Sequence, residues 1–106
     1  MSSFNQQCYE LLKQVPKGRV TTYKAIAEAL GTKAYRAVGN AMNRNPNVGI
    51  VPCHRVVGTD GSIGGYVGGT QRKMELLESE GLSIQSGRIV DFEQKCFFPK
   101  ADEEPD

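Results

Sequence analysis

The chain has 106 residues, of which 39% are hydrophobic and 24% are charged, and its formal net charge is +1. This length suits one compact domain with a hydrophobic core and leaves no room for a second domain, and the composition is that of a globular protein. A membrane protein is not expected, because no apolar run approaches the length of a membrane span.

The N-terminal part of the chain predicts a helix and then a short extended stretch. Apolar residues recur at helical spacing over 3–14, with Ser2 or Ser3 available as the N-cap. The sequence PKG ends this helix, and RVTT at 19–22 is β-prone. The opening residues are too polar for a secretory signal, so we expect a location inside the cell, in the cytoplasm or the nucleus.

A helix-turn-helix follows. Thr22 caps a helix over 23–30 that stops at Gly31, and Thr32 caps a third helix over 33–43. The inner face of the third helix is expected to hold Ala34, Ala37, Val38, Ala41 and Met42. Two helices joined by a tight turn at glycine form a motif that is common in DNA-binding proteins.

This third helix is poor in bulky side chains. Small residues surround Arg36, and one of them is Gly39. Glycine inside a helix costs about 1 kcal/mol relative to alanine, so Gly39 indicates either close helix packing or close approach to a ligand.

The middle of the chain predicts short strands and a loop. GIVP and HRVV read as strand-like runs that are broken at Pro52 and Cys53, and GTDG is a turn. Four glycines around Tyr66, in SIGGYVGG, are typical of a loop or wing near a ligand.

The C-terminal part predicts a fourth helix, capped by Thr70 and ended by Gly81, and a closing strand in RIVDF. The whole pattern predicts a fold that is mainly α with short β, a winged helix-like domain with a helix-turn-helix over 1–99. The segment 100–106, KADEEPD, predicts a disordered acidic tail.

The only histidine of the chain, His54, directly follows Cys53 in VPCHRVV. Neighbouring strand residues point to opposite faces, so this pair needs irregular backbone or a bridging group to act together. The other cysteines, Cys8 and Cys96, lie among apolar residues and are expected to be small buried hydrophobes. Three cysteines and one histidine lack the spacing of a zinc site, so no metal is expected.

A thiol becomes a useful nucleophile when a histidine lowers its pKa and a carboxylate orients that histidine. Glu78 or Glu80 can supply this carboxylate. A plain winged-helix regulator explains the helix pair but leaves the cysteine–histidine pair without a role.

Charge is unevenly distributed along the chain. Ten basic and three acidic residues lie between Met1 and Met74, whereas three basic and nine acidic residues follow. A basic front favours contact with a polyanion such as DNA, although solvated lysines on exposed helix faces explain the charges equally well.

Four segments in order, RAVGNAMNRNP, VPCHRVV, DGSIGGYVGG and LLESEG, resemble the catalytic DNA-binding domain of the O6-alkylguanine-DNA alkyltransferases, over 9–82. In that family of DNA-repair proteins a cysteine irreversibly takes the alkyl (methyl) group from a guanine flipped out of duplex DNA. The resemblance places this single-turnover role on Cys53. It implies no cofactor, because the cysteine is consumed, and a monomer whose partner is double-stranded DNA containing O6-alkylguanine.

The resemblance also implies catalytic roles for the neighbours of the cysteine. His54 is the general base through a bridging water, Glu80 orients His54, and Asn45 holds the cysteine loop. Tyr23 presses on the target phosphate and helps to protonate the leaving base. Without the resemblance, Tyr23 reads as a packing aromatic, Asn45 as a turn residue and Glu80 as a solvated charge.

For DNA binding, the resemblance implies that Arg36 fills the gap left by the flipped base and that Ala34, Ala37 and Gly39 lie deep in the minor groove. The remaining matches concern the substrate pocket. The resemblance implies that the loop around Tyr66 forms the pocket wall and that backbone groups of Cys53, Val56 and Val67 read the guanine. Gly65 and Lys73 are implied to be further pocket residues, although Lys73 can also be interpreted as a surface charge.

The sequence departs from the family pattern in three respects. It begins at the catalytic domain, whereas many alkyltransferases have an additional N-terminal domain, and this length resembles the alkyltransferase-like proteins, which bind the lesion without transfer. Those proteins lack the cysteine that is present here as Cys53. The connection from Tyr23 to Arg36 is one residue shorter than usual, and Val67 stands where serine is frequent, which affects pocket size.

Overall fold

The structure, a computed structural model, describes residues 3–46, 50–66 and 68–101. Helices dominate this part of the chain, and every strand has two residues. The elements follow in the order α1 (Phe4–Leu12), β1 (Thr21–Thr22), α2 (Tyr23–Ala29), α3 (Tyr35–Asn43), the 3₁₀ helix η1 (Cys53–Arg55), β2 (Val56–Val57), α4 (Thr70–Ser79), β3 (Ile84–Gln85), β4 (Arg88–Ile89) and α5 (Phe92–Lys95). The prediction of a mainly α fold with short strands is confirmed.

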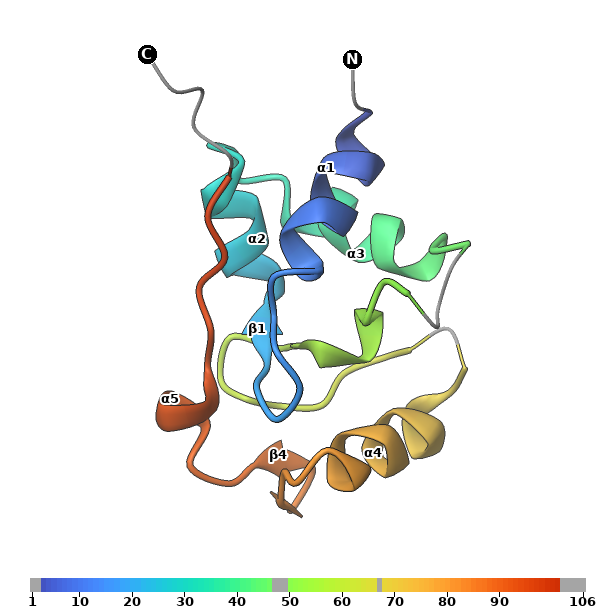
Figure 1. Cartoon of the computed structure of the whole chain (residues 1–106), viewed down its shortest axis with the longest axis vertical. Coiled ribbons are helices and arrows are strands. Elements are labelled where there is room, and N and C mark those ends of the chain that lie inside the picture. Colours follow the sequence, from blue (N-terminus) through green and yellow to red (C-terminus); the bar gives the residue numbers. More distant parts are fainter. Residues whose placement is uncertain (1–2, 47–49, 67, 102–106) are drawn as a thin grey trace.

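Helices α1, α2 and α3 form one end of the molecule (Figure 1). Their facing sides are apolar, and Leu12, Ile26 and Val38 are fully buried between them. The hydroxyl group of Tyr9 donates a 2.8 Å hydrogen bond to the backbone oxygen of Ala41, which joins α1 to the helix that follows the turn. The first helix therefore supports α3 from behind.

The helix-turn-helix consists of α2 and α3. Thr22 caps α2 as predicted, because its hydroxyl oxygen accepts the N–H of Ala25 at 2.9 Å. The predicted cap of α3 at Thr32 is wrong: its hydroxyl accepts the N–H of Ala34, and the helix begins at Tyr35. A hydroxyl that bonds only two residues ahead closes a local turn instead of a helix N-terminus.

The inner face of α3 is narrower than predicted. Val38, Ala41 and Met42 are buried, but Ala34 is exposed and Ala37 is only half-buried, so the prediction is wrong for these two alanines. Because the helix begins two residues late, Ala34 lies before its first turn and on the open side.

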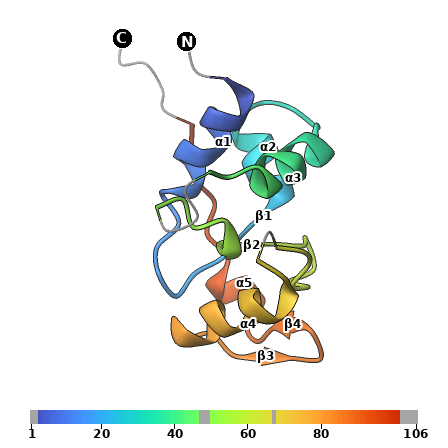
Figure 2. The same ribbon diagram turned by 90° about the vertical axis from the view of Figure 1, so that its right-hand side faces the viewer.

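The two short strands β1 and β2 join the ends of the molecule (Figure 2). They pair in parallel with Thr21 opposite Val56, and Val20 forms a further parallel bridge with Cys96. Below them, α4, the β3–β4 hairpin and α5 enclose a second apolar cluster that includes Val57 and Leu77. The 3₁₀ helix η1, which holds Cys53 and His54, lies between the three-helix end of the molecule and this second cluster.

Several local predictions for the second half need correction. Helix α4 begins at Thr70 with Gly69 in the N-cap position, so Thr70 is the first helical residue and not the cap. The closing strand is short, because only Arg88–Ile89 is extended and Phe92 begins α5. The β3–β4 hairpin was not predicted; its turn places Ser86 and Gly87 at φ values of 52° and 74°.

Cys8 is fully buried, as predicted, whereas Cys96 is only partly buried. At the C-terminal end, the backbone of Lys100 exchanges two hydrogen bonds with the side chain of Gln14, of 2.7 and 3.0 Å. These bonds hold residue 100, the first residue of the expected tail, against α1. Residues 102–106 of that tail lie outside the described residues.

Candidate active site

Cys53 and His54 lie in a 3₁₀ turn, so His54 is not in the strand that was predicted for HRVV. The N–H of Cys53 donates to Val51 O at 2.8 Å and the N–H of Arg55 donates to Pro52 O at 2.9 Å. A 3₁₀ helix has three residues per turn, so its neighbouring side chains need not point to opposite faces, whereas neighbouring side chains in a strand do. The irregular backbone that the pair requires is present, and both residues are buried, with 3% and 7% of their surface exposed.

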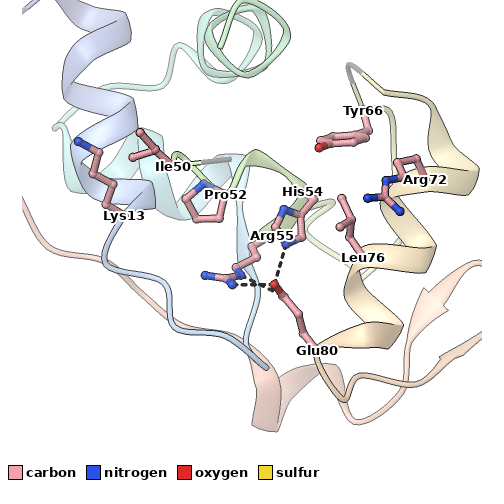
Figure 3. Close-up of a pocket in the computed structure, with 9 residues that line it drawn as sticks. All are labelled: Lys13, Ile50, Pro52, His54, Arg55, Tyr66, Arg72, Leu76 and Glu80. Carbon is pink, nitrogen blue, oxygen red and sulfur yellow. Dashed lines mark hydrogen bonds and ion pairs between the residues drawn. The ribbon is translucent and has the colours of Figure 1, made fainter. Parts of the chain in front are cut away.

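His54 is held by a carboxylate from a distant part of the chain. Its Nε2 lies 3.0 Å from Oε2 of Glu80, the residue that ends α4 (Figure 3). An ionised carboxylate only accepts hydrogen bonds, so in a neutral His54 the Nε2 carries the hydrogen and Nδ1 keeps its lone pair. The pairing excludes the interpretation of Glu80 as a solvated charge.

Arg55 is the residue of this group that sequence reasoning missed. Its Nε and Nη2 donate to the two carboxylate oxygens of Glu80 at 2.9 and 2.7 Å, and its Nη1 donates to Val15 O at 2.9 Å. Such a fork is the strongest geometry for an arginine–carboxylate pair. Arg55 therefore fixes Glu80, and through it His54, to the loop after α1. The position of Arg55 beside His54 was the one available signal.

The electrostatics of the group agree with a neutral histidine and a charged glutamate. Burial lowers the pKa of His54 below its ordinary value, although the hydrogen bond and negative charge of Glu80 oppose this effect. Burial alone would raise the pKa of Glu80, but the hydrogen bonds from Arg55 and His54 outweigh burial and lower it. At neutral pH the arrangement is an imidazole base backed by a carboxylate.

The second ring nitrogen of His54 is the part of the site that remains open. Nδ1 is buried and has no hydrogen-bond partner among the residues that the structure describes. Such a buried acceptor normally has a partner, and its absence marks a position at which a proton can be received. The ring of Tyr66 meets the ring of His54 edge-on, with the ring centroids 6.4 Å apart. Burial raises the pKa of Tyr66.

Asn45 and Lys73 are both buried near the cysteine turn. Nδ2 of Asn45 donates to Val51 O at 2.9 Å, which ties the end of α3 to the residue two before Cys53. Lys73 is 0% exposed, and its Nζ donates to the backbone oxygen of Gly65 at 3.0 Å. Burial lowers the pKa of Lys73 to about 8, against the opposing influence of Cys53. The interpretation of Lys73 as a surface charge is wrong.

Tyr23 approaches the same loop from the other side. A Cβ atom added at Gly64 would lie 3.8 Å from the hydroxyl oxygen of Tyr23 and 3.8 Å from Nζ of Lys73. Gly64 also has a φ of 72°, which side chains rarely allow, so a glycine at this position brings the loop between the two polar groups. Burial and the charge of Cys53 raise the pKa of Tyr23.

Three of the expected DNA-binding residues, Tyr23, Arg36 and Gly39, line one cavity on the surface of the helix-turn-helix. Arg36 is exposed, and the cavity is shallow, with a volume of about 440 Å³. Ala34, the N-cap residue of α3, is exposed and Ala37 is half-buried, and neither of them lines this cavity.

Two further residues, Val56 and Val67, were expected in the substrate pocket. Val56 lies in β2 and is fully buried, backbone included, so a role of its backbone in reading guanine stays a prediction. Val67 lies outside the described residues. A separate cavity of about 410 Å³ opens beside His54 and Tyr66 (Figure 3), and it shares no residue with the cavity over α3.

Within residues 3–46, 50–66 and 68–101, no three His, Cys, Asp or Glu side chains are grouped so that they could hold a metal ion. None of the described helices is long and apolar enough to cross a bilayer.

Fold and site together define a helix-turn-helix domain with a buried cysteine beside a histidine–glutamate–arginine group. The chain belongs to the 6-O-methylguanine DNA methyltransferase family, because residues 3–82 match the model of the DNA-binding domain of this family. This is a family of DNA-binding DNA-repair proteins, and the resemblance that the sequence motifs carry is confirmed.

Curated relatives agree with this assignment. A methylated-DNA–protein-cysteine methyltransferase from Metallosphaera sedula is 48% identical over 84 residues, which are 79% of this chain and 53% of the relative. A bifunctional methyltransferase/endonuclease from Picrophilus torridus is 46% identical over 82 residues, which are 76% of this chain and 28% of the relative. The chain thus spans about half or less of the length of these relatives.

Solved structures show the same fold. S. pombe Atl1, in complex with damaged DNA containing O6-carboxymethylguanine, has a TM-score of 0.80 at 30% identity, and the match covers 93% of this chain and all of that one. Mycobacterium tuberculosis OGT in complex with DNA has a TM-score of 0.71 at 44% identity, over 76% of this chain and 50% of that one.

Proposed function

We propose that this protein binds duplex DNA, flips out an O6-alkylguanine and transfers the alkyl group to Cys53 in a single turnover. One observation carries the proposal: Glu80 holds a neutral His54 that directly follows the buried Cys53, and His54 Nδ1 has no hydrogen-bond partner among the described residues. A thiol with an adjacent base oriented by a carboxylate is the arrangement that nucleophilic catalysis requires. Membership of the family supports the choice of substrate.

In the proposed step, the Cys53 sulfur attacks the alkyl carbon while the bond from that carbon to guanine O6 breaks. His54 takes the thiol proton through a water molecule, and Tyr23 supplies a proton to the departing guanine. The position of Tyr23 suits this role, because its hydroxyl oxygen faces Gly64 of the glycine loop, where an added Cβ atom would lie 3.8 Å from it. The products are guanine in DNA and an S-alkylcysteine.

The remaining residues bind and position the DNA in this proposal. Arg36 enters the stack in place of the flipped guanine, and the small side of α3, with Ala34, Ala37 and Gly39, lies in the minor groove. The guanine then lies between the α3 side and the Tyr66 loop.

The pocket for the flipped guanine is built from the loop that Lys73 holds at Gly65. Backbone groups of Val56 and Val67 read the edge of the base, and Asn45 keeps the cysteine turn in place.

Intact-protein mass spectrometry tests the proposal. Incubation with duplex DNA containing O6-methylguanine adds one methyl group to the wild type and none to Cys53→Ser, while a duplex of the same sequence with unmodified guanine adds none. Tight binding of the lesion without a mass increase overturns transfer. That result supports the alternative of a lesion sensor, which the match to the whole length of Atl1 favours. A preference for an unmodified sequence supports a winged-helix regulator.

A further inference from the structure

Tyr35 is an exposed aromatic side chain at the start of α3. It is the first residue of this helix, and it lines the cavity over α3 together with Arg36 and Gly39. Tyr35 is 39% exposed and belongs to neither apolar cluster of the protein. Its side chain has no ring contact and no hydrogen bond within residues 3–46, 50–66 and 68–101. The packing of the described protein therefore does not explain a tyrosine at this position.

The next turn of α3 is open on the same side. Residues four apart lie on one side of a helix, so Gly39 is the next residue on the Tyr35 side. Apart from its chain neighbours and the backbone of its own helix, a Cβ atom added at Gly39 would meet no described atom within 4 Å. Packing inside the described protein thus does not require glycine there, and close approach to a ligand is the better explanation. The Tyr35 side of α3 consists of a projecting ring beside a flat surface.

The cavity next to Tyr35 attracts anions. None of its lining residues is acidic; they are Tyr23, Lys24, Tyr35, Arg36, Gly39, Gly58 and Thr59. Lys24 and Arg36 form no ion pair with any residue that the structure describes. Two cations without counter-charges at a cavity of about 440 Å³ favour a phosphate backbone beside the ring.

The size of Tyr35 conflicts with the width of a minor groove. This groove is about 6 Å wide in B-DNA, whereas an α-helix with its side chains is about 10–12 Å across. The small residues of α3 let its backbone approach such a groove, but a tyrosine on the same side does not fit unless the DNA is deformed. Proteins that bind the minor groove often insert a large apolar side chain between two base pairs, which partly unstacks them and kinks the duplex.

Tyr35 cannot share the gap that Arg36 fills in the proposed complex. Successive side chains of an α-helix point about 100° apart, because a turn has about 3.6 residues. Their Cα atoms are about 3.8 Å apart, which is close to the rise of about 3.4 Å per base pair. When Arg36 replaces the flipped guanine, Tyr35 therefore meets the base pairs next to the gap.

We propose that Tyr35 is a second wedge, which enters the base step beside the flipped guanine and makes the protein select DNA that is easily deformed at that step. This inference rests on the proposed function, which lays α3 in the minor groove. The energy needed to open a base step depends on its sequence, because pyrimidine–purine steps such as TA unstack readily and A-tracts are stiff. The wedge converts the sequence beside the lesion into a difference in affinity without reading any base edge.

The test compares two duplexes that contain O6-methylguanine, flanked on both sides by TATA in one duplex and by AAAA in the other. Cys53→Ser is the parent protein, so that no methyl group is transferred, and dissociation constants are measured by fluorescence anisotropy. The ratio of the two constants, AAAA over TATA, is determined for the parent and after addition of Tyr35→Ala, Tyr35→Phe or Ile50→Ala. Ile50→Ala is the matched control, because Ile50 is also a large exposed apolar residue but lines the cavity beside His54 and not the cavity over α3.

The parent is expected to bind the TATA duplex about five- to tenfold more tightly, which is the low end of the effect of one aromatic side chain on a base. Tyr35→Ala is expected to abolish this preference, whereas Tyr35→Phe, which retains the ring, and Ile50→Ala are expected to keep it. A merely structural role of Tyr35 would weaken binding to both duplexes equally and leave the ratio unchanged. A parent that binds both duplexes equally, or an unchanged ratio in Tyr35→Ala, overturns the wedge.

Methyl transfer to Cys53 of the wild type is measured separately by mass, which keeps the two ideas apart. If no methyl group is transferred, the proposed function fails, and the ratio of dissociation constants still decides the role of Tyr35. If transfer occurs and Tyr35→Ala keeps the preference of the parent, the proposed function stands and the second wedge is refuted.

Discussion

Replacing Arg55 by methionine tests the whole histidine–glutamate–arginine group. The change removes two hydrogen bonds to Glu80 and one to Val15 O while keeping most of the apolar stem. The side chains of Arg55 and Glu80 are 15% and 10% exposed, so the change leaves a largely buried carboxylate without its main counter-charge. Loss of one partner of a buried pair costs about 3–5 kcal/mol.

The low end of this range applies, because His54 still bonds Glu80. We expect the free energy of unfolding to fall by about 3 kcal/mol, which corresponds to a decrease in Tm of about 12–24 °C for a domain of this size. Urea denaturation followed by circular dichroism measures the change. Arg88→Met is the matched control, since its pair with Asp60 is exposed and is expected to contribute less than about 1 kcal/mol.

The pH dependence of the same variant gives a second, independent readout. In the wild type the folded-state pKa of Glu80 is lowered, so its contribution to stability is present above the unfolded-state pKa, about 4.3, and is lost as pH falls through the folded-state pKa. Without Arg55, burial raises the pKa of Glu80. The difference between wild type and variant is therefore largest near pH 7 and shrinks below about pH 4. A difference no larger than that of Arg88→Met, or one independent of pH, refutes this account of the group.

Two further substitutions address buried polar residues of the site. The folded-state pKa of Lys73 is lowered to about 8, so the free energy of unfolding rises as pH increases from about 8 to the unfolded-state pKa of about 10.4, by up to about 3 kcal/mol. Lys73→Met is expected to remove this rise. If the free energy of unfolding has the same slope against pH in the wild type and in the variant, the assignment is contradicted. Asn45→Ala removes a buried hydrogen bond to Val51 O and is expected to lower the free energy of unfolding by about 1–3 kcal/mol, measured by urea denaturation. The control is Asn43→Ala at an exposed position, which is expected to change this free energy by less than about 0.5 kcal/mol. Equal losses in the two variants would show that the bond does not hold the cysteine turn.

Local hydrogen bonding explains which parts of the fold were predictable. Ser3 and Thr22 cap their helices because the side-chain oxygen of each accepts a hydrogen bond from the backbone N–H three residues later. Such a contact between near neighbours can be recognised in the sequence alone. The start of α3 was not predictable in the same way, because Thr32 can close a shorter turn with equal chemistry. The β3–β4 hairpin was missed because Ser86 adopts a left-handed conformation that serine rarely favours.

For the candidate site, the motifs identified the residues but not their contacts. Glu80 is 26 residues from His54, and Arg55 bonds an oxygen 40 residues away, so both contacts depend on tertiary packing. Lys73 has helical neighbours typical of an exposed charge, and only the packed loop at Gly65 makes it a buried one. Periodicity cannot distinguish these cases, because it describes one element at a time.

The parallel pairing of β1 with β2 has a consequence for how the protein can change in evolution. Tyr23 follows Thr22 directly, and the 3₁₀ turn ends directly before Val56, so the start of the helix-turn-helix and the cysteine turn share one two-residue ladder. An insertion or deletion in either strand would shift that strand by about 3.3 Å relative to its partner and turn its side chains to the other face. Insertions and deletions among homologues are therefore expected at the Gly31 turn and the Ser86–Gly87 turn, whereas the pairing register of β1 with β2 is expected to stay fixed.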